Sequence, residues 1–162
     1  MKALKWIFII AVLIAIDQVT KYLTEAHLPL QQVVELVPTL SLYRTYNYGI
    51  AFSLFSGLNG WPLNLLTFAI IGFVFWLWRG LEPGRWLSSA GFALIIGGAL
   101  GNVIDRVRIG KVVDMILFHI ESLNFSFAVF NVADTFITVG AGIIILDEII
   151  NWRSKNSTTG QS

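Results

Sequence analysis

The chain has 162 residues, of which 56% are hydrophobic and 13% are charged, and its mean hydropathy is +0.72. This composition is typical of an integral membrane protein and not of a soluble domain. A net charge of +1 gives no electrostatic reason to expect nucleic-acid binding, which needs a concentrated basic face. The chain has no cysteine and only two histidines, which excludes disulfides, thiolate metal sites and histidine-rich metal sites.

The first apolar run covers residues 6–16, which is shorter than the about 20 residues that a bilayer-spanning helix needs. The predicted span therefore covers residues 4–23 and includes Asp17 and Lys21. These two residues lie four positions apart, so they can pair on one helix face while Lys21 extends its amine outward to water. Asp17 can belong to a structural ion pair or take a direct part in a functional site, and the sequence favours neither role over the other. A cleavable signal peptide is the alternative, although no small-x-small site follows the run.

Residues 24–61 contain no second long apolar run and are predicted to lie outside the membrane or at its surface. Loose alternation over residues 40–44 predicts a short strand, and the NYG sequence at 47–49 is typical of a turn. Several aromatic residues lie close together here, which suits the headgroup level of a bilayer. We expect a small sheet followed by an amphipathic segment at the membrane interface.

Three further spans are predicted, at residues 62–78, 86–104 and 130–152. A polar turn separates the second span from the third, and residues 105–129 connect the third to the fourth. Gly97 and Gly101 form a small-xxx-small face on which another helix can pack closely. The predicted architecture is a single all-α membrane domain over residues 1–162, with four transmembrane helices and a disordered tail at about 154–162.

Four spans place both termini on one side of the membrane and residues 24–61 and 105–129 on the other. With cytoplasmic termini, six Lys and Arg residues lie inside and five outside, which favours this orientation only weakly. The topology brings polar residues from three spans to one face: Asp17 from the first, Asn102 and Asp105 from the third, and Asp134 from the fourth.

Inserting a carboxylate at membrane depth costs about 2.5–3.5 kcal/mol on insertion scales. Each such residue is therefore a functional candidate unless a paired group accounts for its presence there. Asp134 has a structural alternative, because Asn131 can cap the fourth helix and place Asp134 at position N3, where a helix terminus favours the anion. Asp114 lies in an apolar run, so desolvation should raise its pKa. A coupled pair of this kind offers a general base and a general acid. We interpret Asp114 and Asp134 as a catalytic pair at a membrane surface.

Asn102, Asp105 and Arg106 lie near the end of the predicted third span, at spacings that place Asn102 near both other side chains. One interpretation is a polar helix end that meets lipid headgroups. The other is that Asn102 and Arg106 bind substrate backbone or lipid oxygens, for which the forked donors of arginine are suited. The two histidines have no partner at a catalytic or metal-binding spacing, and we treat both as structural.

Five segments together closely resemble the lipoprotein signal peptidases, which are the type II signal peptidases of the bacterial inner membrane. They are spread over most of the chain, in the same order and around the same four spans. The segments are DQVTK (17–21), NYGIAFS (47–53), GGALGNVIDR (97–106), VVD (112–114) and FNVADTFI (130–137).

The resemblance implies an aspartic endopeptidase that removes the signal peptide from diacylglyceryl-modified prolipoproteins, immediately before the lipidated cysteine. Matched residue by residue, it implies catalysis by Asp114 and Asp134. Residues that match the substrate and inhibitor pocket are Asn47, Asn102, Arg106 and Asn131, and those that we group as supporting are Asp17, Lys21 and Asp105. The mechanism expected for such a pair is direct attack by one water held between the two carboxyl groups.

The resemblance also implies an extracytoplasmic active site, cytoplasmic termini, no metal or other cofactor, and inhibition by globomycin. We expect a monomeric multi-pass protein of the bacterial cytoplasmic (inner) membrane, with the lipidated prolipoprotein, membrane lipid and globomycin as partners and no nucleic acid. Two other classes stay open: a small transporter with a carboxylate relay, and a non-enzymatic assembly factor. Release of a signal peptide from a purified lipidated precursor separates all three.

Overall fold

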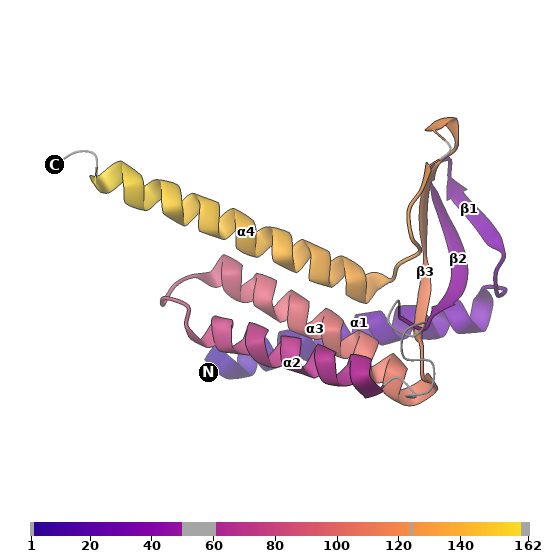
Figure 1. Cartoon of the computed structure of the whole chain (residues 1–162), viewed down its shortest axis with the longest axis horizontal. Helices are drawn as coiled ribbons and strands as arrows, with labels where there is room; N and C mark the ends of the chain where they lie inside the picture. The colour runs from indigo at the N-terminus through magenta and orange to yellow at the C-terminus, as the bar shows by residue number, and fades with distance from the viewer. Residues whose placement is uncertain (1, 50–60, 124, 160–162) are drawn as a thin grey trace.

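The computed structural model describes residues 2–49, 61–123 and 125–159. This part of the chain forms four long helices and a small antiparallel sheet (Figure 1). The helices are α1 (Lys2–His27), α2 (Trp61–Arg79), α3 (Trp86–Ile109) and α4 (Val132–Thr159), and the strands are β1 (Val33–Val37), β2 (Leu40–Asn47), β3 (Val112–Ile120) and β4 (Phe125–Ser126).

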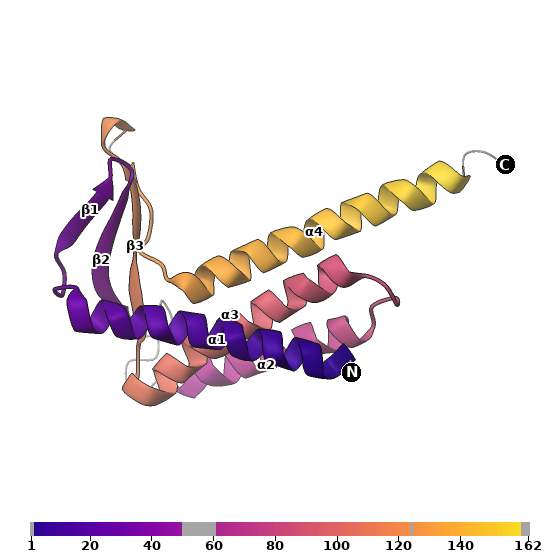
Figure 2. The ribbon, with the colours of Figure 1, turned by 180° about the vertical axis from the view of Figure 1, so that it is seen from behind.

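The sheet stands across one end of the helices, and both chain termini lie at the other end (Figures 1 and 2). Helix α3 lies at the centre, because α1, α2 and α4 all pack against it. The carboxyl ends of α1 and α3 and the amino end of α4 therefore meet beside the sheet. Polar residues at these helix ends are brought together although they are far apart in the sequence.

Three of the described helices are long and apolar enough to cross a bilayer: Leu4–His27, Pro62–Arg79 and Trp86–Ile109, with mean hydropathies of 1.7, 1.4 and 1.7. They correspond to the first three predicted spans, and the chain is a multi-pass membrane protein. The first and third helices continue beyond the predicted ends at residues 23 and 104. The added turns include polar residues that have partners in the protein. Glu25 pairs with Arg108, and Asp105 accepts a hydrogen bond from the backbone N–H of Val113.

Helix α4 begins at Val132 and occupies most of the fourth predicted span. Its backbone stays helical to Thr159, within the segment for which the sequence predicted a disordered tail. Each residue added to an existing helix gains one hydrogen bond, so a polar end can continue it. Residues 160–162 lie outside the described residues, as does most of the segment expected to be amphipathic, at 50–60.

The sheet has the strand order β1-β2-β3-β4 and is larger than the sequence predicted. The expected strands lay within residues 24–61, whereas β3 comes from the connection after α3 and pairs with β2. Its sequence, VVDMILFHI, is rich in residues that favour strands, but so short an apolar run can equally belong to a buried helix. The pairing aligns Thr45 with Asp114 and Asn47 with Val112. Asp114 therefore lies on a strand beside Asn47.

The predicted small-residue face of α3 is confirmed by its packing against α1. A Cβ atom on Gly97 would lie 2.9 Å from Cβ of Leu13, and one on Gly101 would lie 2.5 Å from Oδ2 of Asp17. Only glycine allows the two helices to approach this closely, which places the polar end of α1 directly against α3.

Gly98 lies on the neighbouring face of α3, where an added Cβ would collide with the carbonyl oxygen of Ala133 in α4. We expect Gly98→Ala to lower the free energy of unfolding by about 1–3 kcal/mol, because backbone must move to relieve the overlap. Gly142→Ala is the matched control, since nothing lies within 4 Å of a Cβ there. Thermal unfolding in detergent micelles measures both; an unchanged midpoint for Gly98→Ala would contradict this close packing.

Arg85 connects the middle of α4 to the start of α3. Its guanidinium lies 2.6 Å from Oδ2 of Asp147 and 2.7 Å from Oε1 of Glu148, and Ser88 also donates to Asp147. These contacts, together with the packing of α4 on α3, hold the first half of α4 against the bundle.

Candidate active site

A buried amine on α1 lies at the centre of the polar cluster beside the sheet. Nζ of Lys21 lies 2.9 Å from Oδ2 of Asp17 and 3.0 Å from Oδ2 of Asp105, and it donates a hydrogen bond to Oδ1 of Asn102 at 2.8 Å. The predicted pairing of Asp17 with Lys21 is confirmed. The expectation that Lys21 extends outward to water is wrong, because three acceptors inside the protein match the three donors of the ammonium group. Lys21 is fully buried.

Asp17 connects the same cluster to α4. Its Oδ1 accepts a hydrogen bond from the backbone N–H of Ala133 at 3.0 Å. The first N–H groups of a helix have no partner within the helix, and the helix dipole favours an anion at this end. Asp17 therefore holds the start of α4, which is a structural role.

The side chains of Gln18 and Asp105 connect α1 and β3 to α3. Gln18 donates to Oδ1 of Asp105 at 3.0 Å and to the carbonyl oxygen of Gly101 at 3.1 Å. Oδ2 of Asp105 accepts from the backbone N–H of Val113 at 3.1 Å. Gln18 was not among the site residues predicted from the sequence, although its position next to Asp17 at the end of an apolar run indicated it. Asp105 fixes the strand that carries Asp114.

Two asparagine side chains join Asp114 to Asp134. Asn131 Nδ2 donates to Oδ1 of Asp114 at 2.6 Å and to Oδ1 of Asn102 at 3.2 Å, and Asn102 Nδ2 donates to Oδ1 of Asp134 at 2.8 Å. Lys21 has no acceptor atom, so its bond to Asn102 requires Oδ1 on that side and directs Nδ2 toward Asp134. The buried cation thus determines which way the amide faces.

The predicted cap of α4 is confirmed. Oδ1 of Asn131 accepts from the backbone N–H of Asp134 at 3.0 Å, and Oδ2 of Asp134 accepts from the backbone N–H of Asn131 at 3.3 Å. This is the reciprocal arrangement of a capping box. Asp134 is only partly buried. The cap uses Oδ2 and Asn102 binds Oδ1, so the orientation of this carboxyl group is well determined.

Asp114 is almost fully buried on β3. Desolvation raises its pKa from the ordinary value to about 6, as the sequence predicted, and the negative charge of Asp134 adds to the rise. Hydrogen bonds from Asn131 and Asn47 act in the opposite direction and lower the pKa. Asp114 is thus a buried carboxyl group with a pKa near neutral that responds to the negative charge of Asp134.

Arg106 lies on the last turns of α3, and its charge interacts with those of Asp134, Asp105 and Asp114. Its buried Nε atom forms no hydrogen bond within the described ranges. The adjacent Asp105 is directed instead toward Lys21, as expected for neighbours on a helix. A guanidinium beside two carboxyl groups, with an open donor, is suited to bind a carbonyl or phosphate oxygen.

The remaining candidate side chains take no part in this cluster. His119 Nε2 lies 2.9 Å from Oγ of Ser41, across the pairing of β2 and β3, in agreement with a structural role. No group of three or more His, Cys, Asp or Glu side chains in residues 2–49, 61–123 and 125–159 could hold a metal ion.

Comparison with known proteins gives consistent matches over most of the chain. A family model described as signal peptidase (SPase) II matches residues 9–150. A lipoprotein signal peptidase of Sinorhizobium fredii is 53% identical over 151 residues, covering 93% of this chain and 89% of the relative. One of Brucella ovis is 50% identical over 149 residues, covering 92% of each chain.

Two solved structures have the same fold. Both are described as bacterial membrane enzymes whose structures were determined by the in meso method. One gives a TM-score of 0.79 at 29% identity, covering 93% of this chain and 91% of the other. The second gives a TM-score of 0.75 at 28% identity, covering 88% and 90%.

Proposed function

The chain belongs to the signal peptidase II family, and we propose that it cleaves the signal peptide from diacylglyceryl-modified prolipoproteins, immediately before the lipidated cysteine. The observation that carries this proposal is the cluster in which Asn131 and Asn102 join Asp114 to Asp134 beside the sheet. It contains two carboxyl groups that differ in environment, with Arg106 and Asn47 next to them. Such a pair is suited to acid–base catalysis.

In the proposed mechanism, Asp114 and Asp134 hold one water molecule between them. The ionised carboxylate removes a proton as the water oxygen attacks the scissile carbonyl carbon. The protonated carboxyl group donates its proton to the developing oxyanion. As the C–N bond breaks, the proton taken from water passes to the leaving amine, and the first carboxyl group recovers its proton as the carbonyl re-forms. The products are a signal peptide with a new carboxylate and a lipoprotein with a free cysteine amine, without an acyl-enzyme intermediate.

The raised pKa of Asp114 supports its role as the acid. Asp134 accepts hydrogen bonds from Asn102 and from the backbone of Asn131, and we assign it the role of the base. Because Asp114 responds to the charge of Asp134, this assignment describes the dominant position of one proton in the proposed pair.

Four polar residues complete the proposed site. Asn102 and Asn131 hold the two carboxyl groups, and Asn47 donates to Asp114 from β2. Arg106 has a buried Nε without a hydrogen bond in the described residues, and we assign its guanidinium to a substrate carbonyl or lipid oxygen. We place Asn47, Asn102, Arg106 and Asn131 at the substrate and inhibitor pocket, and we propose that globomycin inhibits by occupying the aspartate pair.

The proposed topology has four spans, with α4 as the fourth, in a single membrane domain. Both termini lie at the end of the molecule away from the sheet (Figure 1), which suits an even number of crossings. We place the termini in the cytoplasm and the active site on the extracytoplasmic side of the bacterial inner membrane, in a monomeric enzyme without a cofactor. The acyl chains of the substrate would remain among the helices and hold the cysteine at the depth of the aspartates.

The experiment that tests this function uses the purified chain in nanodiscs with a prolipoprotein precursor, with and without its diacylglyceryl group. We expect release of the signal peptide from the modified precursor alone, a product that begins at the lipidated cysteine by mass spectrometry, and no release with globomycin. Absence of release from the modified precursor would contradict the proposal and leave a transporter or an assembly factor as the alternative.

Asn47→Ala is expected to shift the pH dependence of cleavage in a defined direction. The hydrogen bond from Asn47 lowers the pKa of Asp114, so its loss raises that pKa above about 6. If protonated Asp114 is the acid, the alkaline limb of the rate profile moves to higher pH. Ser41→Ala on the same strand is the control and should leave the limb in place. A shift of the Asn47→Ala limb to lower pH would exclude Asp114 as the acid.

A further inference from the structure

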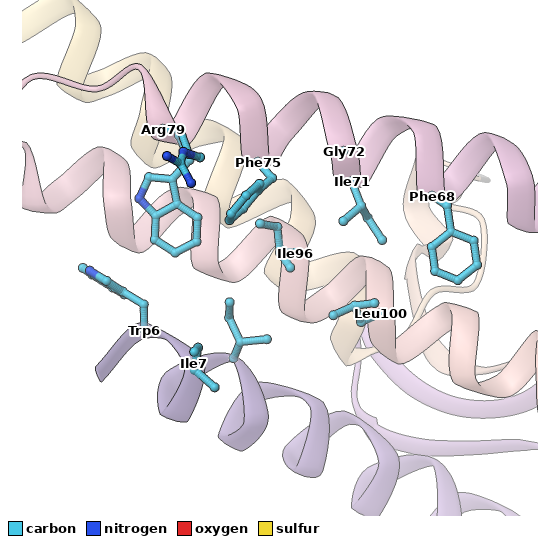
Figure 3. Close-up of a pocket in the computed structure, with 11 residues that line it drawn as sticks. Trp6, Ile7, Phe68, Ile71, Gly72, Phe75, Arg79, Ile96 and Leu100 are labelled. Carbon is cyan, nitrogen blue, oxygen red and sulfur yellow. The ribbon is translucent and has the colours of Figure 1, made fainter. Parts of the chain in front are cut away.

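A cavity of about 660 Å³ lies between α1, α2 and α3, separate from the polar cluster (Figure 3). Its wall is apolar along most of its length, and its volume falls within the about 300–1,000 Å³ of small-molecule sites. Trp6 lines it from α1, Phe68 and Phe75 from α2, and Ile96 and Leu100 from α3.

The cavity exists because α1 and α2 both pack on α3 and leave space between themselves. The rings of Trp6 and Trp78 meet edge to face at one end, with centroids 5.7 Å apart. Gly72 contributes no side chain to the wall of α2, and no atom lies within 4 Å of a Cβ placed there. A larger side chain at Gly72 therefore fits into open space.

Positive charge gathers at the end of the cavity where the two tryptophan rings meet. Arg79, the last residue of α2, lines this end, and Nζ of Lys5 lies 5.5 Å from the centroid of the Trp6 ring. Figure 3 shows Arg79 and Trp6 at one end and Phe68 and Leu100 at the other. Tryptophan together with lysine or arginine is typical of the membrane interface. The cavity thus has a cationic mouth at the interface and an apolar interior at membrane depth.

We propose that this cavity binds one acyl chain of an anionic phospholipid from the leaflet on the side of the termini, with the lipid phosphate on Arg79. The positive charge at the mouth of the cavity favours this lipid over a signal peptide as the occupant. A signal peptide begins with a positively charged segment. Arg79 and Lys5 would repel that segment, whereas they attract a phosphate. The acyl chains of the substrate start at the opposite end, beside the sheet, if the proposed function is correct.

The test is native mass spectrometry of the delipidated full chain, titrated with phosphatidylglycerol or phosphatidylcholine that carry identical acyl chains. We expect one phosphatidylglycerol to be retained in preference to phosphatidylcholine. One basic group near a membrane surface contributes about fivefold in lipid affinity, so Arg79→Gln should reduce the preference by about that factor and Arg79→Lys should keep most of it. The readout is lipid binding, so it is independent of the proposed peptidase activity.

Gly72→Phe should fill the cavity and weaken binding of both lipids. Gly142→Phe is the matched control, because Gly142 also has open space around its Cβ but lies on α4. Thermal unfolding of each variant verifies that it is folded. The proposal would be overturned if the wild-type chain retained the two lipids equally, or if folded Gly72→Phe bound them as the wild type does. It would also be overturned if, without lipid, the chain formed a dimer in which the surface around Gly72 is the interface.

Discussion

Asp114→Asn and Asp134→Asn are each expected to reduce signal-peptide cleavage by about 10²–10⁴-fold, the range that general acid–base groups contribute. An amide has nearly the shape of a carboxyl group and keeps one oxygen for the donor of Asn131 or Asn102, although at Asp134 one of the two accepted hydrogen bonds is lost. It can neither remove nor supply the proton in the reaction. The loss should therefore appear in the chemical step, with little change in folding.

Single-turnover cleavage of the lipidated precursor measures this loss, and unfolding midpoints show whether the variants are folded. Glu35→Gln is the matched control, because Glu35 is an exposed carboxylate on β1. It should cleave at the wild-type rate. Turnover within tenfold of wild type by either aspartate variant would remove that residue from the catalytic pair.

Lys21→Met is expected to lower the free energy of unfolding by about 3–5 kcal/mol, the cost of removing one partner from a buried ion pair. The change leaves Asp17 and Asp105 facing each other without the cation between them. It also removes the bond that orients Asn102. We therefore expect slower cleavage even under conditions in which the variant stays folded.

Denaturant unfolding in mixed micelles measures the effect, with Arg108→Ala as the control. The Arg108–Glu25 pair is 3.2 Å apart, but its side chains are 45% and 26% exposed, so its loss should cost only about 0–1 kcal/mol. Adding Asp17→Asn and Asp105→Asn to Lys21→Met removes the uncompensated charges and should recover part of the stability. If Lys21→Met costs no more than Arg108→Ala, the buried network does not stabilise the fold.

The features that depend on local sequence were predicted from the chain. Three spans follow from the apolar runs, and the cap of α4 follows from the spacing of Asn131 and Asp134. The raised pKa of Asp114 follows from the apolar residues around it. Each of these properties is determined within a few positions of the residue concerned.

The features that depend on contacts between distant segments could not be predicted. An acid four positions before Lys21 correctly predicts an ion pair, but only the position of Asp105 on α3 explains why the amine lies inside. The VVDMILFHI segment fits a strand or a buried helix, and its pairing with β2 decides between them. The link from Asn131 through Asn102 to the aspartates likewise needs three separate elements in place.

The most direct test of the central claim is an infrared titration of the two carboxyl groups, with isotopically labelled aspartate and the two Asn variants to assign the bands. We expect Asp114 to become protonated near pH 6 in the wild type. In Asp134→Asn its pKa should fall, because the charge that helps to raise it is gone. An Asp114 band whose titration is unaffected by Asp134→Asn would show that the two groups do not interact, and a shared proton could not drive cleavage.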